Sequence, residues 1–257
     1  MDPPPPMIQS RAMNLGIIGF GQFGQFAANH LRRIVHVTVW DLRDLRKRAA
    51  ALGVTWGALA DAASRELVLL AVPIAEMPAC LEAVVPYLKP GALVMDGCSV
   101  KVLPVQWMLA RVPAEVEVIG MHPLFGPQSG RAGVAGLSVV ICPARSHRLD
   151  LLRRFLEEMG LVVHLSTPEE HDRAMAQTQA LSQYISRGLI LADIQDSPLK
   201  TPAFELLHRM VGMLKPDSKE LFEDMHRFNP FAAEERRKLL EALLRIHRHL
   251  EDLPRDA

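Results

Sequence analysis

The sequence is short of cysteine, of aromatic residues and of any excess of charge. Only Cys80, Cys98 and Cys142 occur among 257 residues, and their scatter predicts neither a disulfide framework nor a metal site. Lysine plus arginine and aspartate plus glutamate each number 29, so no overall positive field attracts nucleic acid or an anionic membrane. The few, scattered cysteines favour a reducing compartment, so we expect a cytoplasmic protein. The balanced charge argues against nucleic-acid partners.

Long apolar runs are lacking as well. No stretch approaches the roughly 20 apolar residues that cross a bilayer, and the opening Met1–Pro6 has neither the basic nor the apolar part of a signal peptide. Its four consecutive prolines cannot enter a helix or a sheet interior, so residues 1–12 are predicted to form a disordered tail. Because 49% of the residues are apolar, the remaining chain can bury a core.

Short apolar runs alternate with helical patterns from Asn14 onward. Strands are predicted at 15–18, 35–40, 67–72, 93–95, 116–121, 137–141 and 161–165, with helices such as 24–31, 42–52 and 74–88 between them. This alternation predicts an α/β fold, a Rossmann-type doubly wound and mostly parallel sheet, in a dinucleotide-binding domain of residues 13–166. Thr167-Pro168-Glu169-Glu170 is typical of a helix start, and no convincing strand follows. Residues 167–257 are therefore predicted to form an all-α domain for substrate binding and dimerisation.

The last helical pattern carries a leucine stripe, formed by Leu239, Leu240, Leu243, Leu244 and Leu250. A helical layer this small beside a nucleotide domain often completes its core with a second copy, so we predict a homodimer through the C-terminal helices. The alternative is that the stripe packs within its own chain, which the pattern alone does not exclude.

A glycine-rich loop directly follows the first predicted strand. Gly19-Phe20-Gly21-Gln22-Phe23-Gly24 has the spacing of a dinucleotide fingerprint, and we assign all six residues, with Val72-Pro73 after a later strand, to cofactor binding. Asp41 ends the second strand, where a carboxylate can accept hydrogen bonds from an adenosine ribose, which points to NAD. Arg43 leaves NADP possible, because an arginine there could hold a 2′-phosphate; the alternative for Arg43 and its basic neighbours is a solvated helix face.

Two candidate catalytic residues follow later strands. His122 comes after the strand 116–121, and Ser99 lies in Asp96-Gly97-Cys98-Ser99-Val100-Lys101 after the strand 93–95, so both are expected at the rim that carries the glycine loop. A neutral imidazole is the natural acceptor for the hydroxyl proton of an alcohol that loses hydride, and Ser99 could orient that hydroxyl. The alternatives are a hydrogen-bonded turn histidine and a helix N-cap serine. Cys98 is interpreted as a small, half-buried side chain.

These blocks, followed by His122-Pro123-Leu124-Phe125-Gly126-Pro127-Gln128-Ser129-Gly130 and Glu170-His171-Asp172-Arg173, resemble prephenate and arogenate dehydrogenases in order and spacing. The amino-acid sequences of the Ser99 and His122 blocks are most similar to those of the arogenate-type members of plants. The resemblance implies NAD(P)-dependent oxidative decarboxylation in tyrosine biosynthesis, with His122 taking the 4-hydroxyl proton and Ser99 keeping it in register. It also implies that Ser129 contributes to substrate binding.

Two positions depart from the family pattern. A histidine that contacts the substrate side chain in many microbial members is replaced by Gln183, and an arginine that grips a carboxylate is replaced by Met213. Since a buried carboxylate without a cation is costly, we expect Arg187 or Arg209 to supply the charge, unless it comes from elsewhere, the partner subunit included. Alternatively, Gln183 or Glu205 could meet a substrate ammonium, which argues mildly against strict use of prephenate.

Two competing hypotheses remain open. One is a dehydrogenase of a related cyclohexadienol in a specialised pathway, which Gln183 and Met213 would allow. The other is a cofactor-binding regulatory protein without turnover. The intact His122 and Ser99 argue against the latter, because a binder needs no base.

Overall fold

The computed structural model describes residues 13–215 and 217–254, so the predicted tail at 1–12 lies outside the described residues. The chain forms two compact units that divide between His171 and Asp172. Within the described residues, no helix combines the length and the apolar character that crossing a membrane requires.

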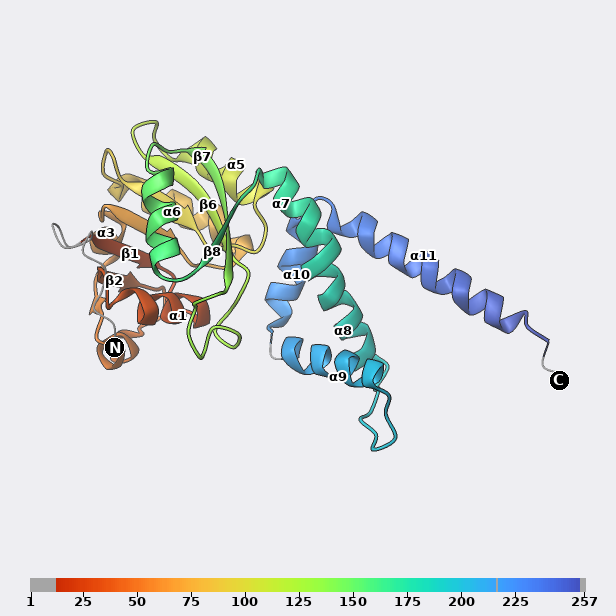
Figure 1. Cartoon of the computed structure of the whole chain (residues 1–257). Helices are drawn as coiled ribbons and strands as arrows, with labels where there is room; N and C mark the ends of the chain where they lie inside the picture. The colour runs from red at the N-terminus through yellow and green to blue at the C-terminus, as the bar shows by residue number, and fades with distance from the viewer. Residues whose placement is uncertain (1–12, 216, 255–257) are drawn as a thin grey trace. The chain divides into compact units, whose positions relative to one another are not determined.

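One eight-stranded sheet forms the frame of the first unit (Figure 1). Its strands are β1 (Asn14–Ile18), β2 (His36–Trp40), β3 (Thr55–Trp56), β4 (Leu67–Leu70), β5 (Leu93–Asp96), β6 (Glu117–Pro123), β7 (Ser138–Arg145) and β8 (Val162–Leu165). They lie in the order β3-β2-β1-β4-β5-β6-β7-β8, and every neighbouring pair is parallel except β6 and β7. The predicted Rossmann-type, mostly parallel sheet is confirmed.

Helices cover both faces of this sheet. They are α1 (Gln22–Leu31), α2 (Arg46–Leu52), α3 (Leu59–Ala63), η1 (Ile74–Glu76), α4 (Met77–Val84), η2 (Val85–Tyr87), α5 (Val102–Arg111) and α6 (Leu149–Glu158). Alternate strand residues such as Leu15 and Ile17 form one core with buried residues of α1, α2 and α6. On the other face, Gly16 lets α3 approach β1. Burial on both faces explains why the strands are near-continuous apolar runs in the sequence.

Several predicted boundaries change in the structure. The strand predicted at 67–72 ends at Leu70, and the helix predicted at 74–88 is divided into η1, α4 and η2, since Pro78 and Pro86 interrupt its backbone hydrogen bonding. The two-residue strand β3 was not predicted. His122 lies inside β6 rather than after it, because the antiparallel partner β7 prolongs the ladder and pairs His122 with Val140.

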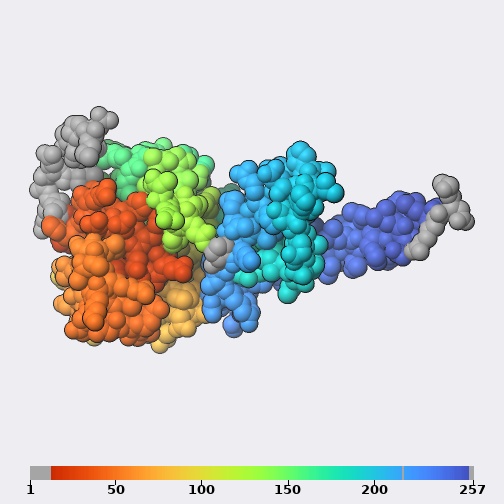
Figure 2. Space-filling model, turned by 90° about the horizontal axis from the view of Figure 1, so that it is seen from below, coloured from red at the N-terminus to blue at the C-terminus, as the bar shows by residue number. Residues whose placement is uncertain are grey.

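The second unit is helical. From the end of α7 (Pro168–Met175), the chain continues through η3 (Ala176–Ala180), α8 (Leu181–Leu191), α9 (Pro202–Leu214), α10 (Lys219–Phe228) and α11 (Ala232–Glu251). Ala176, Ala180 and Ala232 form a small buried cluster where η3 and the start of α11 meet. Beyond it, α11 extends as a single rod from the other helices of this unit (Figures 1 and 2). Its stripe residues Leu240, Leu243, Leu244 and Leu250 stay exposed.

Gly16 provides a test of the packing between β1 and α3. A Cβ at this position would lie 1.8 Å from the carbonyl oxygen of Ala62, so Gly16→Ala forces the backbone to move. We expect a loss of about 2 kcal/mol or more in the free energy of unfolding, measured by urea titration. The matched control is Gly188→Ala on the exposed surface of α8, where a Cβ meets nothing within 4 Å. That change should stabilise the protein by about 0.5–1 kcal/mol, because alanine favours a helix interior. Equal effects at the two sites would contradict the packing account.

Candidate active site

The glycine loop joins β1 to α1 at the carboxyl edge of the sheet. Gly19 has φ of 95°, and a Cβ there would lie 2.5 Å from the carbonyl oxygen of Ala71. At Gly24 a Cβ would lie 2.0 Å from the carbonyl oxygen of Gly19, so α1 packs closely on the turn. By contrast, a Cβ on Gly21 meets only the Arg43 guanidinium, 3.9 Å away, and no side chain caps the start of α1. The residues therefore fit a dinucleotide, since an open helix N-terminus binds pyrophosphate.

The other predicted cofactor residues have different surroundings. Phe20 is fully buried in the core and shapes the loop, whereas Gln22 is exposed at the first turn of α1. Val72 lies against Gly19, and Pro73 is exposed at the start of η1. The ring of Phe23 lies 2.6 Å from where a Cβ of Gly97 would be, so α1 packs directly on the loop that carries Ser99.

Asp41 is anchored at the end of β2 by three groups. Its Oδ2 accepts the backbone N–H of Phe20 at 2.7 Å, and its Oδ1 accepts the backbone N–H of Arg43 at 2.9 Å and the Arg43 Nε at 3.0 Å. Burial alone would raise the pKa of Asp41, but these hydrogen bonds from Arg43 and Phe20 hold it below its usual value. The Asp41 side chain is 9% exposed and that of Arg43 is 68% exposed. The Arg43 guanidinium can therefore move away from Asp41 while the carboxylate keeps its position.

His122 and His171 form a buried pair. The Nδ1 of His122 lies 2.9 Å from the Nε2 of His171, and the two rings meet edge to face. Both side chains are nearly inaccessible, at 4% and 2% exposure. Burial, followed by the neighbouring His171 and the ammonium of Lys101, lowers the pKa of His122 well below its ordinary value of 6.5. His122 is therefore a neutral base near pH 7.

Asp96 and Lys101 form an ion pair in which both side chains are completely buried, and the Lys101 ammonium acts electrostatically on His122. The Lys101 ammonium also donates to the carbonyl oxygen of Met121 at 2.7 Å, and Asp96 Oδ1 accepts the Cys98 N–H at 2.9 Å. These bonds connect the end of β5 to the end of β6. The structure thus places the Ser99 loop and His122 on adjacent strand ends.

Ser99 is buried, and its hydroxyl has no hydrogen-bond partner within the described residues. The N-cap alternative is wrong, because α5 begins at Val102 with Lys101 at its N-cap. Among the described residues, the Ser99 hydroxyl forms no hydrogen bond with His122, and the Nδ1 of His122 is hydrogen-bonded to His171. A buried hydroxyl without a protein partner is the group expected where a ligand completes the hydrogen bonding.

The loop after β6 packs on α1 through aromatic contacts. Phe125 packs edge-on against Phe26, with 6.1 Å between the ring centroids. A Cβ on Gly130 would lie 2.5 Å from the Phe26 ring, so the ring would have to shift for any larger residue there. Ser129 is exposed in this loop, and its hydroxyl accepts the Gly126 N–H at 3.0 Å. Its observed role is to shape the turn, and its assignment to substrate binding stays a prediction.

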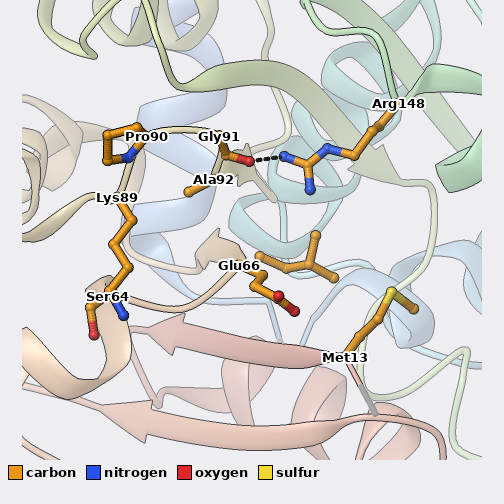
Figure 3. A pocket seen from close by; sticks show the side chains of 9 residues that line it. Met13, Ser64, Glu66, Lys89, Pro90, Gly91, Ala92 and Arg148 are labelled. Atoms are coloured by element: carbon orange, nitrogen blue, oxygen red, sulfur yellow. Dashed lines mark hydrogen bonds between the residues drawn. The ribbon is translucent and has the colours of Figure 1, made fainter. Parts of the chain in front are cut away.

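A cavity of about 490 Å³ lies at the opposite, amino edge of the sheet (Figure 3). It is lined by residues that precede β1, β4 and β5 or follow the antiparallel β7, among them Met13, Glu66, Lys89, Gly91 and Arg148. Arg148 is held there by the carbonyl oxygen of Gly91 and by the Glu117 carboxylate. No residue of the glycine loop and neither His122 nor Ser99 lines this cavity, so it is separate from the candidate active site.

The predicted substrate residues of the second unit form two groups. Gln183 is buried, its amide nitrogen donates to the Asp217 carboxylate, and its Oε1 has no partner within the described residues. Arg187 donates to the backbone oxygen of Asp217 at 2.7 Å and lies over the Phe222 ring. In contrast, three residues of α9, namely Glu205, Arg209 and Met213, are exposed. Asp217 was not among the predicted residues, since its contact with α8 spans 34 positions of sequence.

Comparison with known proteins agrees with this geometry. The family model described as the nucleotide-binding domain of prephenate dehydrogenase matches residues 27–165, which is more than half of the chain. The chain belongs to the prephenate dehydrogenase family. Residues 189–256 match a second model, described as a TYRAAT1-like C-terminal domain. The resemblance inferred from the motifs is confirmed, as is a nicotinamide dinucleotide, NAD or NADP, as the class of cofactor.

Among individual relatives, arogenate dehydrogenase 1 of Arabidopsis thaliana is 30% identical over 87% of this chain and 37% of its own length. A probable arogenate/prephenate dehydrogenase of Methanocaldococcus jannaschii is 30% identical over 84% of this chain and 51% of its own length. The chain thus spans about a third to a half of these two relatives. The crystal structure of A. aeolicus prephenate dehydrogenase with hydroxyphenyl propionate and NAD+ has the same fold, with a TM-score of 0.75, 23% identity and coverage of 95% and 94% of the two chains.

The Asp96–Lys101 pair provides a stability test. Lys101→Met leaves the buried Asp96 carboxylate without its cation, which should cost about 3–5 kcal/mol in the free energy of unfolding. Combining it with Asp96→Asn removes the unpaired charge, so the double variant should be more stable than Lys101→Met alone. Thermal and urea unfolding of both variants measure the difference. Equal stability of the single and double variants would contradict a buried, charged pair.

Proposed function

We propose that this chain catalyses the NAD(P)-dependent oxidative decarboxylation of arogenate to tyrosine or of prephenate to 4-hydroxyphenylpyruvate. The observation that carries the proposal is His122, a buried imidazole kept neutral at the nucleotide-binding edge of a chain from this family. Its Nδ1 is engaged by His171, which leaves Nε2 to meet a substrate hydroxyl.

The reaction needs one base and one oriented hydroxyl. When bound, the nicotinamide supplies the acceptor for the hydride that leaves the ring carbon bearing the 4-hydroxyl. His122 takes the hydroxyl proton as the C–O bond gains double-bond character. Cleavage of the bond to the ring carboxylate releases carbon dioxide, and its electron pair makes the ring aromatic. The resulting phenolate oxygen recovers the proton from His122, so no net proton is consumed.

Ser99 and the Asp96–Lys101 pair support this step. The Ser99 hydroxyl, which has no partner among the described residues, can donate to the substrate oxygen or to the nicotinamide, in agreement with its burial in the loop after β5. The Lys101 ammonium, held under β6, disfavours a second positive charge on His122 before substrate arrives. Release of the proton to the phenolate is favoured for the same reason.

NAD is the preferred cofactor in this proposal. The Asp41 carboxylate is fixed by the Phe20 N–H and has a lowered pKa, so it is ionised and can accept a hydrogen bond from the ribose 2′-hydroxyl. A 2′-phosphate would meet that carboxylate, and the exposed Arg43 is already engaged with it. The basic residues Arg46, Lys47 and Arg48 are exposed on α2, which is compatible with the alternative of a solvated helix face.

The helical unit is proposed to bind the substrate side chain, and its chemistry favours arogenate. The buried amide oxygen of Gln183 has no partner among the described residues and belongs to a side chain that bonds the Asp217 carboxylate, and both groups can accept hydrogen bonds from an ammonium. The Arg187 cation, which is bound to backbone oxygens, can balance the substrate carboxylate. Arg209 keeps the same predicted role as an exposed alternative on α9.

We also propose that α11 forms a homodimer contact with a second copy of this chain. Its leucines are exposed along most of a 20-residue helix that is flanked by charged residues. An unpaired apolar stripe of this kind is typical of a helix that packs against a partner.

Initial-rate assays with arogenate and prephenate, each with NAD and NADP, test the function directly. The expected result is turnover with arogenate and NAD, detected as the absorbance of the reduced nicotinamide and as tyrosine by chromatography. The absence of turnover in all four combinations would overturn the proposed function.

His122→Asn tests the role of the base. The asparagine keeps a polar side chain of similar reach but cannot take a proton near pH 7, so turnover should fall by roughly 10²- to 10⁴-fold. Cofactor affinity, measured by calorimetry, should remain near the wild-type value because His122 is not part of the glycine loop. Turnover like that of the wild type would exclude His122 as the base.

A further inference from the structure

His171 lies within hydrogen-bond distance of the proposed base, with 2.9 Å between its Nε2 and the Nδ1 of His122, and has no assigned role in the reaction described above. It lies in the first turn of α7, whose start is fixed by reciprocal bonds: Thr167 N–H donates to Glu170 Oε2 at 3.1 Å, and Glu170 N–H donates to Thr167 Oγ1 at 3.2 Å. The His171 N–H then donates to the Thr167 carbonyl at 3.0 Å. The capped helix start therefore holds the His171 ring against His122.

We propose that His171 is a positioning residue that fixes both the ring orientation and the tautomer of His122 by accepting a hydrogen bond from its Nδ1. This role rests on the proposed function of His122 as the base. His171 itself touches neither substrate nor cofactor in this account.

The tautomer decides whether His122 can act as a base. Of the two ring nitrogens in a neutral imidazole, one carries the proton and the other carries the lone pair. If His122 Nδ1–H donates to His171 Nε2, the lone pair of His122 lies on Nε2, where it can take a hydroxyl proton. The opposite arrangement puts the proton on Nε2 and blocks that step. Only the first arrangement is compatible with proton abstraction.

The proposal requires a neutral His171, because a protonated imidazole has no Nε2 lone pair with which to accept the Nδ1–H of His122. The groups that act on His122 are His171 on α7 and the Lys101 ammonium before α5, and Lys101 is paired with Asp96 on β5. An anionic partner, as in a serine protease triad, would favour protonation of His122 before substrate binds. A neutral histidine orients the ring without adding that charge. After proton transfer, its Nε2 lone pair still accepts the Nδ1–H of the imidazolium.

The first experiment measures the tautomer without any substrate. Long-range ¹H–¹⁵N correlation spectra of the full chain at neutral pH, with His122 assigned from His122→Asn, distinguish a protonated Nδ1 from a protonated Nε2. We expect Nδ1–H in the wild type. In His171→Leu, which removes the acceptor, the His122 signals should move toward the Nε2–H form. Detection of Nε2–H in the wild type would overturn the proposal, whatever the activity assays show.

The second experiment measures catalysis. His171→Leu should lower kcat by about 10- to 100-fold with little change in KM, a smaller loss than the roughly 10⁴-fold loss caused by altering a charged triad partner. His171→Gln should recover part of kcat, because its amide oxygen can accept from His122 Nδ1. The matched control is His164→Leu, which removes an exposed histidine that is hydrogen-bonded to the Ser138 hydroxyl. This change should leave kcat and the His122 signals unchanged.

The outcomes separate this proposal from the proposed function. If the wild type has no turnover but shows Nδ1–H on His122, the reaction assignment fails while the positioning role stands. If His171→Leu retains wild-type kcat or an unchanged His122 tautomer, the positioning role is overturned. If His171→Leu does not fold, the spectra of the wild type and of His171→Gln still decide the question: Nδ1–H on His122 in both supports the positioning role, and Nε2–H in either overturns it.

Discussion

The buried pair of Asp96 and Lys101 is the interaction on which the candidate active site depends. It lies between the ends of β5 and β6 and bonds to the backbone of Cys98 and Met121. Two neighbouring strands are thereby held in one arrangement at the edge where the proposed chemistry takes place. The same ammonium acts on His122, so a structural contact also tunes the proposed base. Removing one charge would affect strand ends, loop and imidazole together.

The cofactor end of the site is built by close packing instead of charge pairing. Glycines at 19 and 24 let β1, α1 and the end of β4 approach within distances that no side chain allows. Two side chains of α1 make the further contacts: the Phe23 ring packs on Gly97, and the Phe26 ring packs on Phe125. A single helix thus joins the dinucleotide loop to the Ser99 loop and to the segment after His122. This explains how motifs far apart in sequence meet at one edge.

Much of this arrangement was predictable from sequence, because it follows from alternating apolar runs and from parallel strands that end at one edge. The glycine loop, His122 and Ser99 each come directly after a strand pattern. The role of His171 was not predictable in the same way, since its contact with His122 spans 49 positions and depends on where α7 begins. The Gln183–Asp217 contact was missed for the same reason. His122 itself belongs to β6 because of an antiparallel partner that local sequence does not reveal.

The central claim is that His122 works as a base that burial and its neighbours keep neutral. The most direct measurement is the pH dependence of kcat/KM for the wild-type protein with arogenate and NAD, the proposed substrate and cofactor. A base must be unprotonated, so the rate should fall on acidification through the pKa of His122, and the structure predicts a midpoint below the ordinary histidine value of 6.5. A midpoint at or above 6.5, or a rate that does not fall in acid, would contradict the account.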